Sequence, residues 1–281
     1  MSNTTQRLLT AAVAVPIMYF IFLVGGIVYL LFFMALTLVG QIEYNKLLES
    51  KNLPNHKTQG VIFSLALALS AYAGYFYFTM AFTGVLLLIL ILDLRKVGSS
   101  ETVISLGSTL LGIIYLGWLL SHALLLRNIY EFEAVKTYSE NIQGLRDAVF
   151  FFDLLAFACT YLNDTGAYYT GRLIGRRKLN PVISPGKTVE GSIGGVFVCI
   201  LTALVVNYLF SEPLNSEWAV AFGLVAGVAS VFGKRSAGIK DSGVMVPGHG
   251  GVLDRFDSLI FVFPVFYYMA LIYYLAKGVS L

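Results

Sequence analysis

The densest set of side chains able to do chemistry lies at residues 233 to 258, in the run GKRSAGIKDSGVMVPGHGGVLDRFDS. Basic residues there could neutralise phosphate charge, and carboxylates could hold a hard divalent cation. The bases are Lys234, Arg235, Lys240 and Arg255, and the acids are Asp241, Asp254 and Asp257. Magnesium is usually held by one or two carboxylates and shared with substrate phosphates. The run therefore predicts a site for Mg²⁺ and a phosphorylated substrate.

The spacing within this run adds two details. Asp254 and Asp257 are spaced i, i+3, so a helix that begins near them would carry both on one face. Beside His249, glycines such as Gly250 would let the backbone approach a ligand closely. We expect catalysis to depend on Asp254, Asp241, Lys240 and Arg255, and we predict that Lys234, Arg235, His249 and Gly250 contact the substrate.

A second polar stretch, YLNDTGAYYTGRLIGRRKLNPVISPGKTVEG, covers residues 161 to 191. Asp164 lies at the inner end of an apolar run, and Asp153 lies eleven residues earlier, on nearly the same helix face. Intramembrane carboxylates usually face a cavity or a partner, so this face is a candidate site. The alternative is that a neighbouring helix satisfies Asp153 and that Asp164 caps a helix end. The candidate substrate-binding residues here are Asn163, Asp164, Ser184, Lys187, Thr188 and Glu190.

The segment SPGKT within this stretch ends like a phosphate-binding P-loop. That motif needs a glycine where this chain has Pro181, and we expect no strand before it, so the pattern argues against a P-loop NTPase. Lys187 nevertheless lies beside the start of a predicted helix. Backbone amides at a helix N-terminus, together with a lysine, suit a phosphate group.

The rest of the chain must place these stretches at a membrane. Hydrophobic residues make up 57% of the 281 residues, charged residues only 12%, and the mean hydropathy is +0.77. This composition lies outside the range of soluble domains. Apolar runs occur near residues 8–24, 27–39, 60–75, 77–92, 103–126, 147–169, 192–210, 217–233 and 257–276. We expect an all-α polytopic helical bundle with eight or nine transmembrane helices, because lipid offers no partner for backbone polar groups.

The charge distribution predicts the orientation of this bundle. With the N-terminus in the cytoplasm, 15 of the 19 Lys and Arg residues lie on the cytoplasmic side, and the others are Arg127, Lys136, Arg146 and Lys277. The positive-inside rule supports that topology. Both polar stretches then lie at the cytoplasmic face. We predict one membrane domain over residues 1–281, with N-terminal helices at 1–146 and a motif-bearing part at 147–281; Cys159 and Cys199 are expected to be buried small hydrophobic residues.

The run KRSAGIKDSGVMVPGHGGVLDRFDS resembles the signature of the phosphatidate cytidylyltransferase family, K-R-x4-K-D-x-G, then P-G-H-G-G, then D-R-x-D. NDTGAY and SPGKTVEG are similar to another block of that family. The resemblance implies an integral membrane enzyme that moves a cytidylyl group from CTP to phosphatidate with Mg²⁺, forming CDP-diacylglycerol and pyrophosphate. It implies a bacterial-type inner membrane, a cytoplasmic active face and no nucleic-acid partner, and it leaves a homodimer open.

One departure from the family pattern affects the expected activity. The family normally has a G-D-x-x-E-S-x-x segment before the paired Lys and Arg, whereas here Gly233 is followed directly by Lys234. Seven residues are therefore missing, including an Asp expected to bind metal opposite Asp254. Two alternatives follow from the sequence: a catalytically silent nucleotide- or lipid-binding homologue, and a secondary transporter that uses Asp153 and Asp164.

Overall fold

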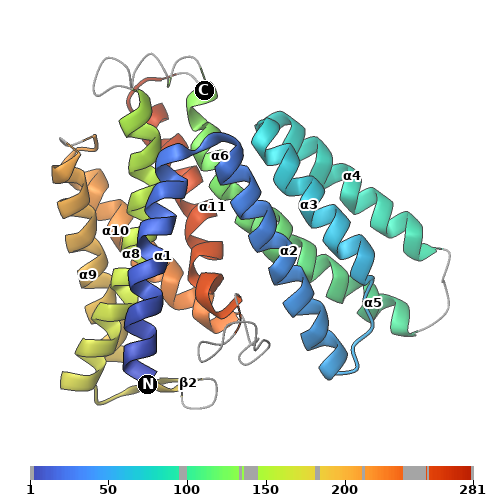
Figure 1. The fold of residues 1–281 in the computed structure, drawn as a ribbon, viewed down its shortest axis with the longest axis horizontal. Coiled ribbons are helices and arrows are strands. Elements are labelled where there is room, and N and C mark those ends of the chain that lie inside the picture. Colours follow the sequence, from blue (N-terminus) through green and yellow to red (C-terminus); the bar gives the residue numbers. More distant parts are fainter. Residues whose placement is uncertain are drawn as a thin grey trace. The chain divides into compact units, whose positions relative to one another are not determined.

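The computed structural model describes residues 3–94, 100–132, 135, 145–180, 184–210, 213–236, 251 and 253–279. These residues are almost entirely helical (Figure 1). The N-terminal helices are α1 (Asn3–Val24), α2 (Gly26–Ser50), α3 (Lys57–Ala73) and α4 (Tyr75–Leu94), followed by α5 (Ser100–Gly112), the π-helix η1 (Ile113–Leu119), α6 (Leu120–Arg127) and the 3₁₀-helix η2 (Asn128–Glu131). The later helices are α8 (Leu145–Ile174), α9 (Val189–Leu209), α10 (Ser216–Ser236) and α11 (Leu253–Ala276).

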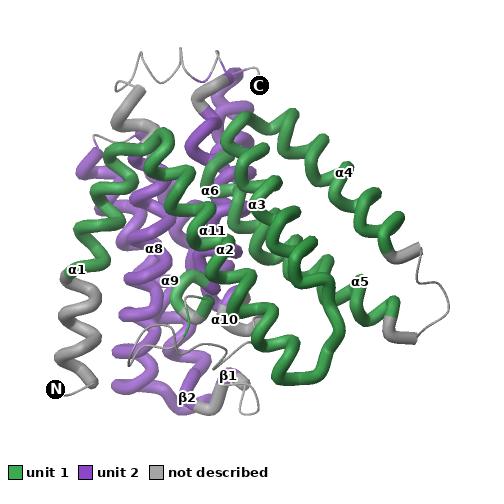
Figure 2. The backbone as a smooth tube through the Cα atoms, turned by 45° about the vertical axis from the view of Figure 1, so that its right-hand side comes forward, with its two compact units in different colours: residues 1–125, 239–256 green, residues 126–238, 257–281 purple. Residues whose placement is uncertain are grey.

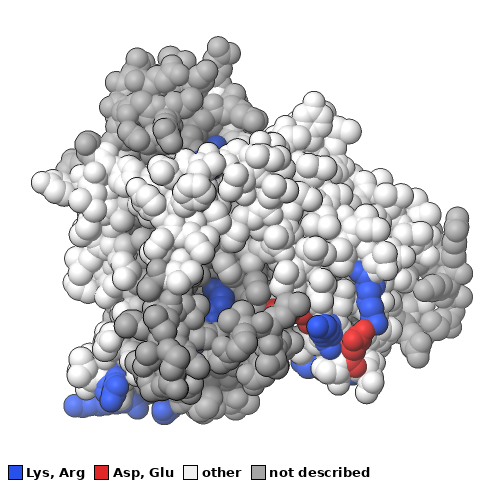
Figure 3. Space-filling model, in the orientation of Figure 1, with Lys and Arg blue, Asp and Glu red and all other residues white. Residues whose placement is uncertain are grey.

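The apolar runs form helices as predicted, and the fifth run is shared between α5, η1 and α6. Five described helical segments are long and apolar enough to cross a bilayer: Gly26–Ser50, Tyr75–Leu92, Thr102–Arg127, Val189–Leu209 and Arg255–Ala276. Large apolar side chains stay exposed, for example Phe76 at 68% and Val103 at 75%. The described side chains on the face drawn in Figure 3 are mostly uncharged. The all-α polytopic membrane fold is therefore confirmed, and the count of eight or nine spans stays a prediction.

The helices group into two compact units, coloured separately in Figure 2. Unit 1 comprises residues 1–125 and 239–256, and unit 2 comprises residues 126–238 and 257–281. The expectation of a single membrane domain, with N-terminal helices at 1–146 and a motif-bearing part at 147–281, stays a prediction. Each unit has its own buried core: Tyr29, Phe33, Leu67 and Phe78 are at most 1% exposed in unit 1, and Phe151, Phe222, Phe263 and Phe266 in unit 2.

Unit 1 satisfies buried polar groups across its helices. The Gln41 amide on α2 donates to Ser64 Oγ at 2.6 Å and to the Gly112 carbonyl at 2.9 Å. Gln41 is 1% exposed, so these bonds offset the cost of removing its amide from water. They connect α2 to α3 and to the end of α5.

Unit 2 depends on close contact between α8, α9 and α10. A Cβ at Gly195 of α9 would lie 2.5 Å from Asn163 Oδ1 of α8, and a Cβ at Gly227 of α10 would lie 2.8 Å from Val196 Cα of α9. Small residues of this kind let membrane helices approach closely. The Cys199 thiol donates to the Cys159 carbonyl at 3.0 Å, and both cysteines are free and buried as predicted.

The connection from α8 to α9 differs from the prediction. Lys178–Asn180 (β1) and Ser184–Thr188 (β2) pair as a two-stranded antiparallel sheet. The expectation of no strand near SPGKT was wrong, because local backbone pairing in a short hairpin leaves little periodic signal in the sequence. The segment SPGKT is itself the second strand and runs directly into α9, so it does not form a phosphate-binding loop between a strand and a helix.

Asp153 has a cationic partner. Arg127 Nη1 lies 2.7 Å from Asp153 Oδ2, and the Asp153 side chain is fully buried. The alternative that a neighbouring element satisfies this carboxylate is confirmed. Asp153 therefore belongs to the packing of unit 2.

Candidate substrate-binding site

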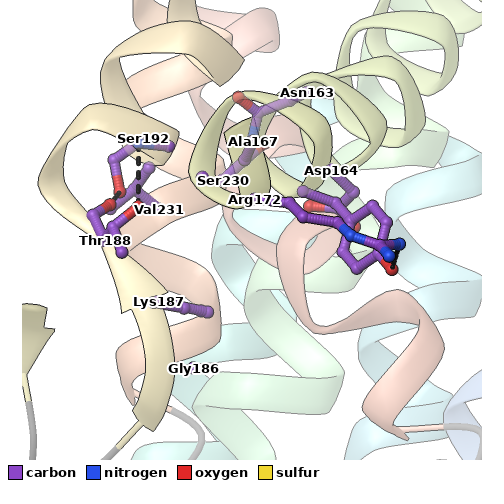
Figure 4. Close-up of a pocket in the computed structure, with 13 residues that line it drawn as sticks. Asn163, Asp164, Ala167, Arg172, Gly186, Lys187, Thr188, Ser192, Ser230 and Val231 are labelled. Carbon is purple, nitrogen blue, oxygen red and sulfur yellow. Dashed lines mark hydrogen bonds between the residues drawn. The ribbon is translucent and has the colours of Figure 1, made fainter. Parts of the chain in front are cut away.

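A cavity of about 330 Å³ lies within unit 2. Its walls come from the end of α8, from β2 with the first turn of α9, and from α10 (Figure 4). Its polar and charged lining residues include Asn163, Asp164, Arg172, Lys187, Thr188 and Ser230. The volume falls at the lower end of the range for small-molecule sites.

The last turns of α8 supply one wall because of their residue spacing. Asn163, Ala167 and Gly171 follow one another at i, i+4 and i+8, and Asp164 and Arg172 occupy the adjacent row. Residues three and four apart lie on one side of a helix, so the α8 contribution is continuous. The small residue Gly171 in the first row lets Thr188 approach closely, since a Cβ there would lie 2.9 Å from Thr188 Oγ1.

The hairpin positions Lys187 on the opposite wall. Thr188 is the N-cap of α9, and its Oγ1 accepts a hydrogen bond from the Gly191 amide at 3.1 Å. The Glu190 carboxylate accepts from the backbone amides of Arg176 and Arg177 at 3.0 and 3.2 Å. Glu190, predicted to bind substrate, thus connects the first turn of α9 to the residues between α8 and β1.

Two buried polar atoms of the cavity wall lack a hydrogen-bond partner among the described residues. They are Asn163 Oδ1 and Ser230 Oγ, on side chains of residues that are 3% and 0% exposed. Buried polar atoms are nearly always paired, and an unpaired one costs about 1–3 kcal/mol. Both residues line the cavity, but the two atoms themselves are shielded from it, and Asn163 Oδ1 packs against Gly195 of α9.

The charges of the cavity suit a phosphorylated molecule. Arg172 and Lys187 bring two cations to it, and Asp164 brings one carboxylate. An arginine can bind phosphate through two parallel hydrogen bonds, whereas a lysine acts as a point charge. The structure places Asn163, Asp164, Lys187 and Thr188 in the lining of one cavity, and their role in substrate binding stays a prediction.

The residues of the other predicted stretch are only partly described. Lys240, Asp241, His249 and Gly250 lie outside the described residues. Ser184 in β2, Lys234 and Arg235 in α10, and Asp254 in α11 have a described backbone, but their side chains lie outside the described part. Arg255 is exposed, and Asp257 Oδ1 accepts a hydrogen bond from the Ser258 amide at 2.6 Å. Asp254 and Asp257 both belong to α11, and the magnesium site stays a prediction.

Sequence reasoning missed four polar residues of the cavity: Tyr168, Arg172, Ser192 and Ser230. Ser230 is a single hydroxyl within an apolar run, and the sequence gives no sign that it faces a cavity. Arg172 belongs to a basic cluster that we interpreted mainly as a topology anchor. A better signal was its spacing of eight residues from Asp164, which places both on the same side of α8.

The amino-acid sequence is similar to those of known cytidylyltransferases. Residues 5–273 match the model of the cytidylyltransferase family. A phosphatidate cytidylyltransferase from Synechocystis is 31% identical over 295 residues, covering 95% of this chain and 97% of that protein. A phosphatidate cytidylyltransferase from Staphylococcus epidermidis is 46% identical over 138 residues, covering 46% of this chain and 50% of that protein. An uncharacterised Escherichia coli protein, YnbB, is 45% identical over 135 residues, covering 46% of this chain and 44% of that protein.

Proposed function

Because the chain belongs to the cytidylyltransferase family and is a nucleotidyltransferase, we propose that it transfers the cytidylyl group of CTP to phosphatidate. The products are CDP-diacylglycerol and pyrophosphate. The structural observation that carries the proposal is the cavity of unit 2, which two cationic residues, Arg172 and Lys187, line together with the polar residues Asn163, Thr188 and Ser230. Such a cavity fits a phosphate-rich ligand with hydrogen-bonding groups.

The reaction joins two anions. A phosphate oxygen of phosphatidate attacks the α-phosphorus of CTP, the bond from the α-phosphorus to the bridging oxygen breaks, and pyrophosphate leaves. Repulsion between the two anions grows in a poor dielectric, so positive charge has to be in place beforehand. Lys187 and Arg172 would supply part of that charge and orient the phosphates. Bound Mg²⁺, which Asp254, Asp257 and Asp241 are proposed to hold, would neutralise further charge on the transferred group.

We predict that Lys187→Ala and Arg255→Ala each weaken CTP binding. Losing one charge-assisted contact to a desolvated phosphate costs roughly 1.5–3 kcal/mol, or about ten- to a hundredfold in affinity. The measurement is CTP titration of the full chain in detergent with Mg²⁺ present. Lys277→Ala is the matched control, because Lys277 is an exposed cation that neither lines the cavity nor belongs to the signature run at residues 234–258. Unchanged CTP affinity in both test variants would overturn the assignment.

We further propose that the protein lies in a bacterial-type inner membrane with its active face in the cytoplasm. The N-terminus, residues 171–191 and residues 234–256 would be cytoplasmic, and residues 127–146 would lie outside. Cysteines introduced singly at Ser236 and at Ser139 should therefore react with membrane-impermeant reagents from opposite sides of the membrane. Ser139 lies outside the described residues. Cys159 and Cys199 are buried and can be replaced first. Labelling of both positions from one side would contradict this topology.

A catalytically silent binding protein is the second candidate, and the missing acidic segment before Lys234 favours it. CTP would still bind in the cavity of unit 2, but no lipid product would form. Of the two acids on which the transporter alternative was based, Asp153 pairs with Arg127, whereas Asp164 lines the cavity of unit 2. CTP binding without lipid product would identify the silent protein.

A further inference from the structure

Glu43 is a buried acid that the proposed reaction does not yet use. It lies in α2, in the segment QIEYNK, and is 1% exposed. Glutamate is almost never fully buried unless it is paired, because burying an ionised carboxylate is costly. The buried Glu43 carboxylate therefore requires hydrogen-bonding or charged partners within unit 1.

Those partners lie 210 residues away in the sequence, where α11 begins. The Leu253 amide donates to Glu43 Oε2 at 2.9 Å. A Cβ at Gly251 would lie 2.7 Å from the same oxygen and 3.1 Å from Glu43 Cδ. Glycine at this position thus lets the chain pass directly against the carboxylate, and all of these contacts lie within unit 1.

The interaction stabilises the first turn of α11. The first four amides of a helix have no acceptor within the helix, and the N-terminus carries partial positive charge. A carboxylate that accepts from such an amide acts as a cap supplied by another helix. Leu253 is the first residue of α11, and Asp254, a proposed metal ligand, follows it.

We propose that Glu43 is a positioning residue for nucleotide transfer: by holding Leu253 against α2, it fixes the first turn of α11 and with it the place of Asp254. This inference rests on the proposed function. A ligand carboxylate has to stay within about 0.5 Å of its productive position, and residues behind it provide that precision. Loss of such outer support typically costs 10–100-fold in metal affinity.

The test compares three variants of the full chain in detergent. Glu43→Ala removes the acceptor of the Leu253 amide, and Glu43→Gln keeps a neutral acceptor of the same shape. Gln41→Leu is the control, because Gln41 is equally buried on α2 but bonds to Ser64 and Gly112. The readout is the Mg²⁺ concentration that gives half-maximal CTP binding, with hydrogen exchange of the peptide containing Leu253 measured in parallel.

We expect Glu43→Ala to raise the required Mg²⁺ concentration by about tenfold or more and to speed exchange at Leu253. Glu43→Gln should show a smaller shift, and Gln41→Leu should leave the Mg²⁺ requirement unchanged. If Glu43→Ala does not fold, Gly251→Ala replaces it, since the added methyl has to displace the Glu43 carboxylate and should shift the same two readouts.

The outcomes separate this inference from the proposed function. A wild-type chain that binds no CTP at any Mg²⁺ concentration would overturn the proposed function and the role of Glu43 with it. A wild-type chain that binds CTP, with an unchanged Mg²⁺ requirement in the variants, would overturn the positioning role alone. In that second case the positioning role would be wrong even if hydrogen exchange at Leu253 became faster in the variants. Faster exchange alone would show that Glu43 stabilises the first turn of α11 without affecting the Mg²⁺ requirement.

Discussion

Restoring an acidic D-x-x-E-S-x-x segment between Gly233 and Lys234 is expected to raise the rate of CDP-diacylglycerol formation by about 100-fold or more. The reason is electrostatic. Removing one preorganised group that stabilises transition-state charge typically costs 10²–10³ in rate, and the missing Asp is expected to hold metal opposite Asp254. Two of the remaining acids of the signature, Asp254 and Asp257, are only three residues apart in α11, and the third is Asp241.

The structure explains why the chain can fold without this segment. The helix α10 runs continuously to Ser236, through the point where the segment is missing. Seven residues make almost two turns of a helix with 3.6 residues per turn, so a helical insertion of that length would extend α10 by about 10 Å and hardly rotate the residues after it. Before that point, a Cβ at Gly233 would lie 3.0 Å from Ser258 Cα, so α10 already packs closely on α11. An insertion after Gly233 would preserve this contact.

The comparison uses three proteins: the chain as it stands, the version with the acidic segment, and a version whose inserted Asp and Glu are Asn and Gln. All are incubated with CTP, phosphatidate and Mg²⁺, and the lipid product is followed over time. We expect only the acidic insert to raise the rate. Equal rates for the chain and the acidic version would show that the missing Asp is dispensable or replaced here, for instance by Asp164 or Asp241, and our interpretation of the metal site would be wrong.

The variant Arg127→Met should lose about 3–5 kcal/mol of unfolding free energy. Arg127 Nη1 lies 2.7 Å from Asp153 Oδ2, and the side chains of Arg127 and Asp153 are 16% and 0% exposed. Removing Arg127 leaves the Asp153 carboxylate buried without its cation. An uncompensated buried charge strongly lowers the free energy of unfolding. Unfolding of the purified protein in mixed micelles, followed by circular dichroism, measures the change.

The double variant Arg127→Met/Asp153→Leu is the control for this prediction. Replacing a whole buried ion pair by apolar residues is often neutral or stabilising, so the double variant should recover most of the lost stability. Neither residue lines the cavity of unit 2, so both variants should keep CTP affinity to the extent that they fold. A single variant as stable as the wild type would show that the pair contributes little.

The sequence predicted the helices well because one physical rule dominates in a membrane. Backbone groups inside lipid have to bond within the chain, so a long apolar run can be assigned to a helix without knowledge of its neighbours. The hairpin of β1 and β2 was missed because it depends on local backbone pairing. Lys187 could be proposed as a phosphate ligand from its position before a helix, although the strand that carries it could not be predicted.

Contacts between distant segments explain the other differences. The partner of Asp153 is Arg127, 26 residues earlier, and the partner of Glu43 is 210 residues later. Neither pairing has a periodic signal in the sequence. Ser230 likewise becomes a site residue only because α10 packs beside α8 and α9. Residue types identified the chemistry, whereas tertiary packing determined which side chains meet.

Transfer of the cytidylyl group to the lipid is tested most directly with CTP labelled at the α-phosphate or at the γ-phosphate. The full chain is reconstituted in vesicles with or without phosphatidate, and Mg²⁺ is added or removed by a chelator. We expect the α-label, and not the γ-label, to enter the lipid slowly as CDP-diacylglycerol, and only when phosphatidate and Mg²⁺ are both present. If neither this chain nor the version with the acidic segment transfers the α-label to lipid, the proposed function is wrong.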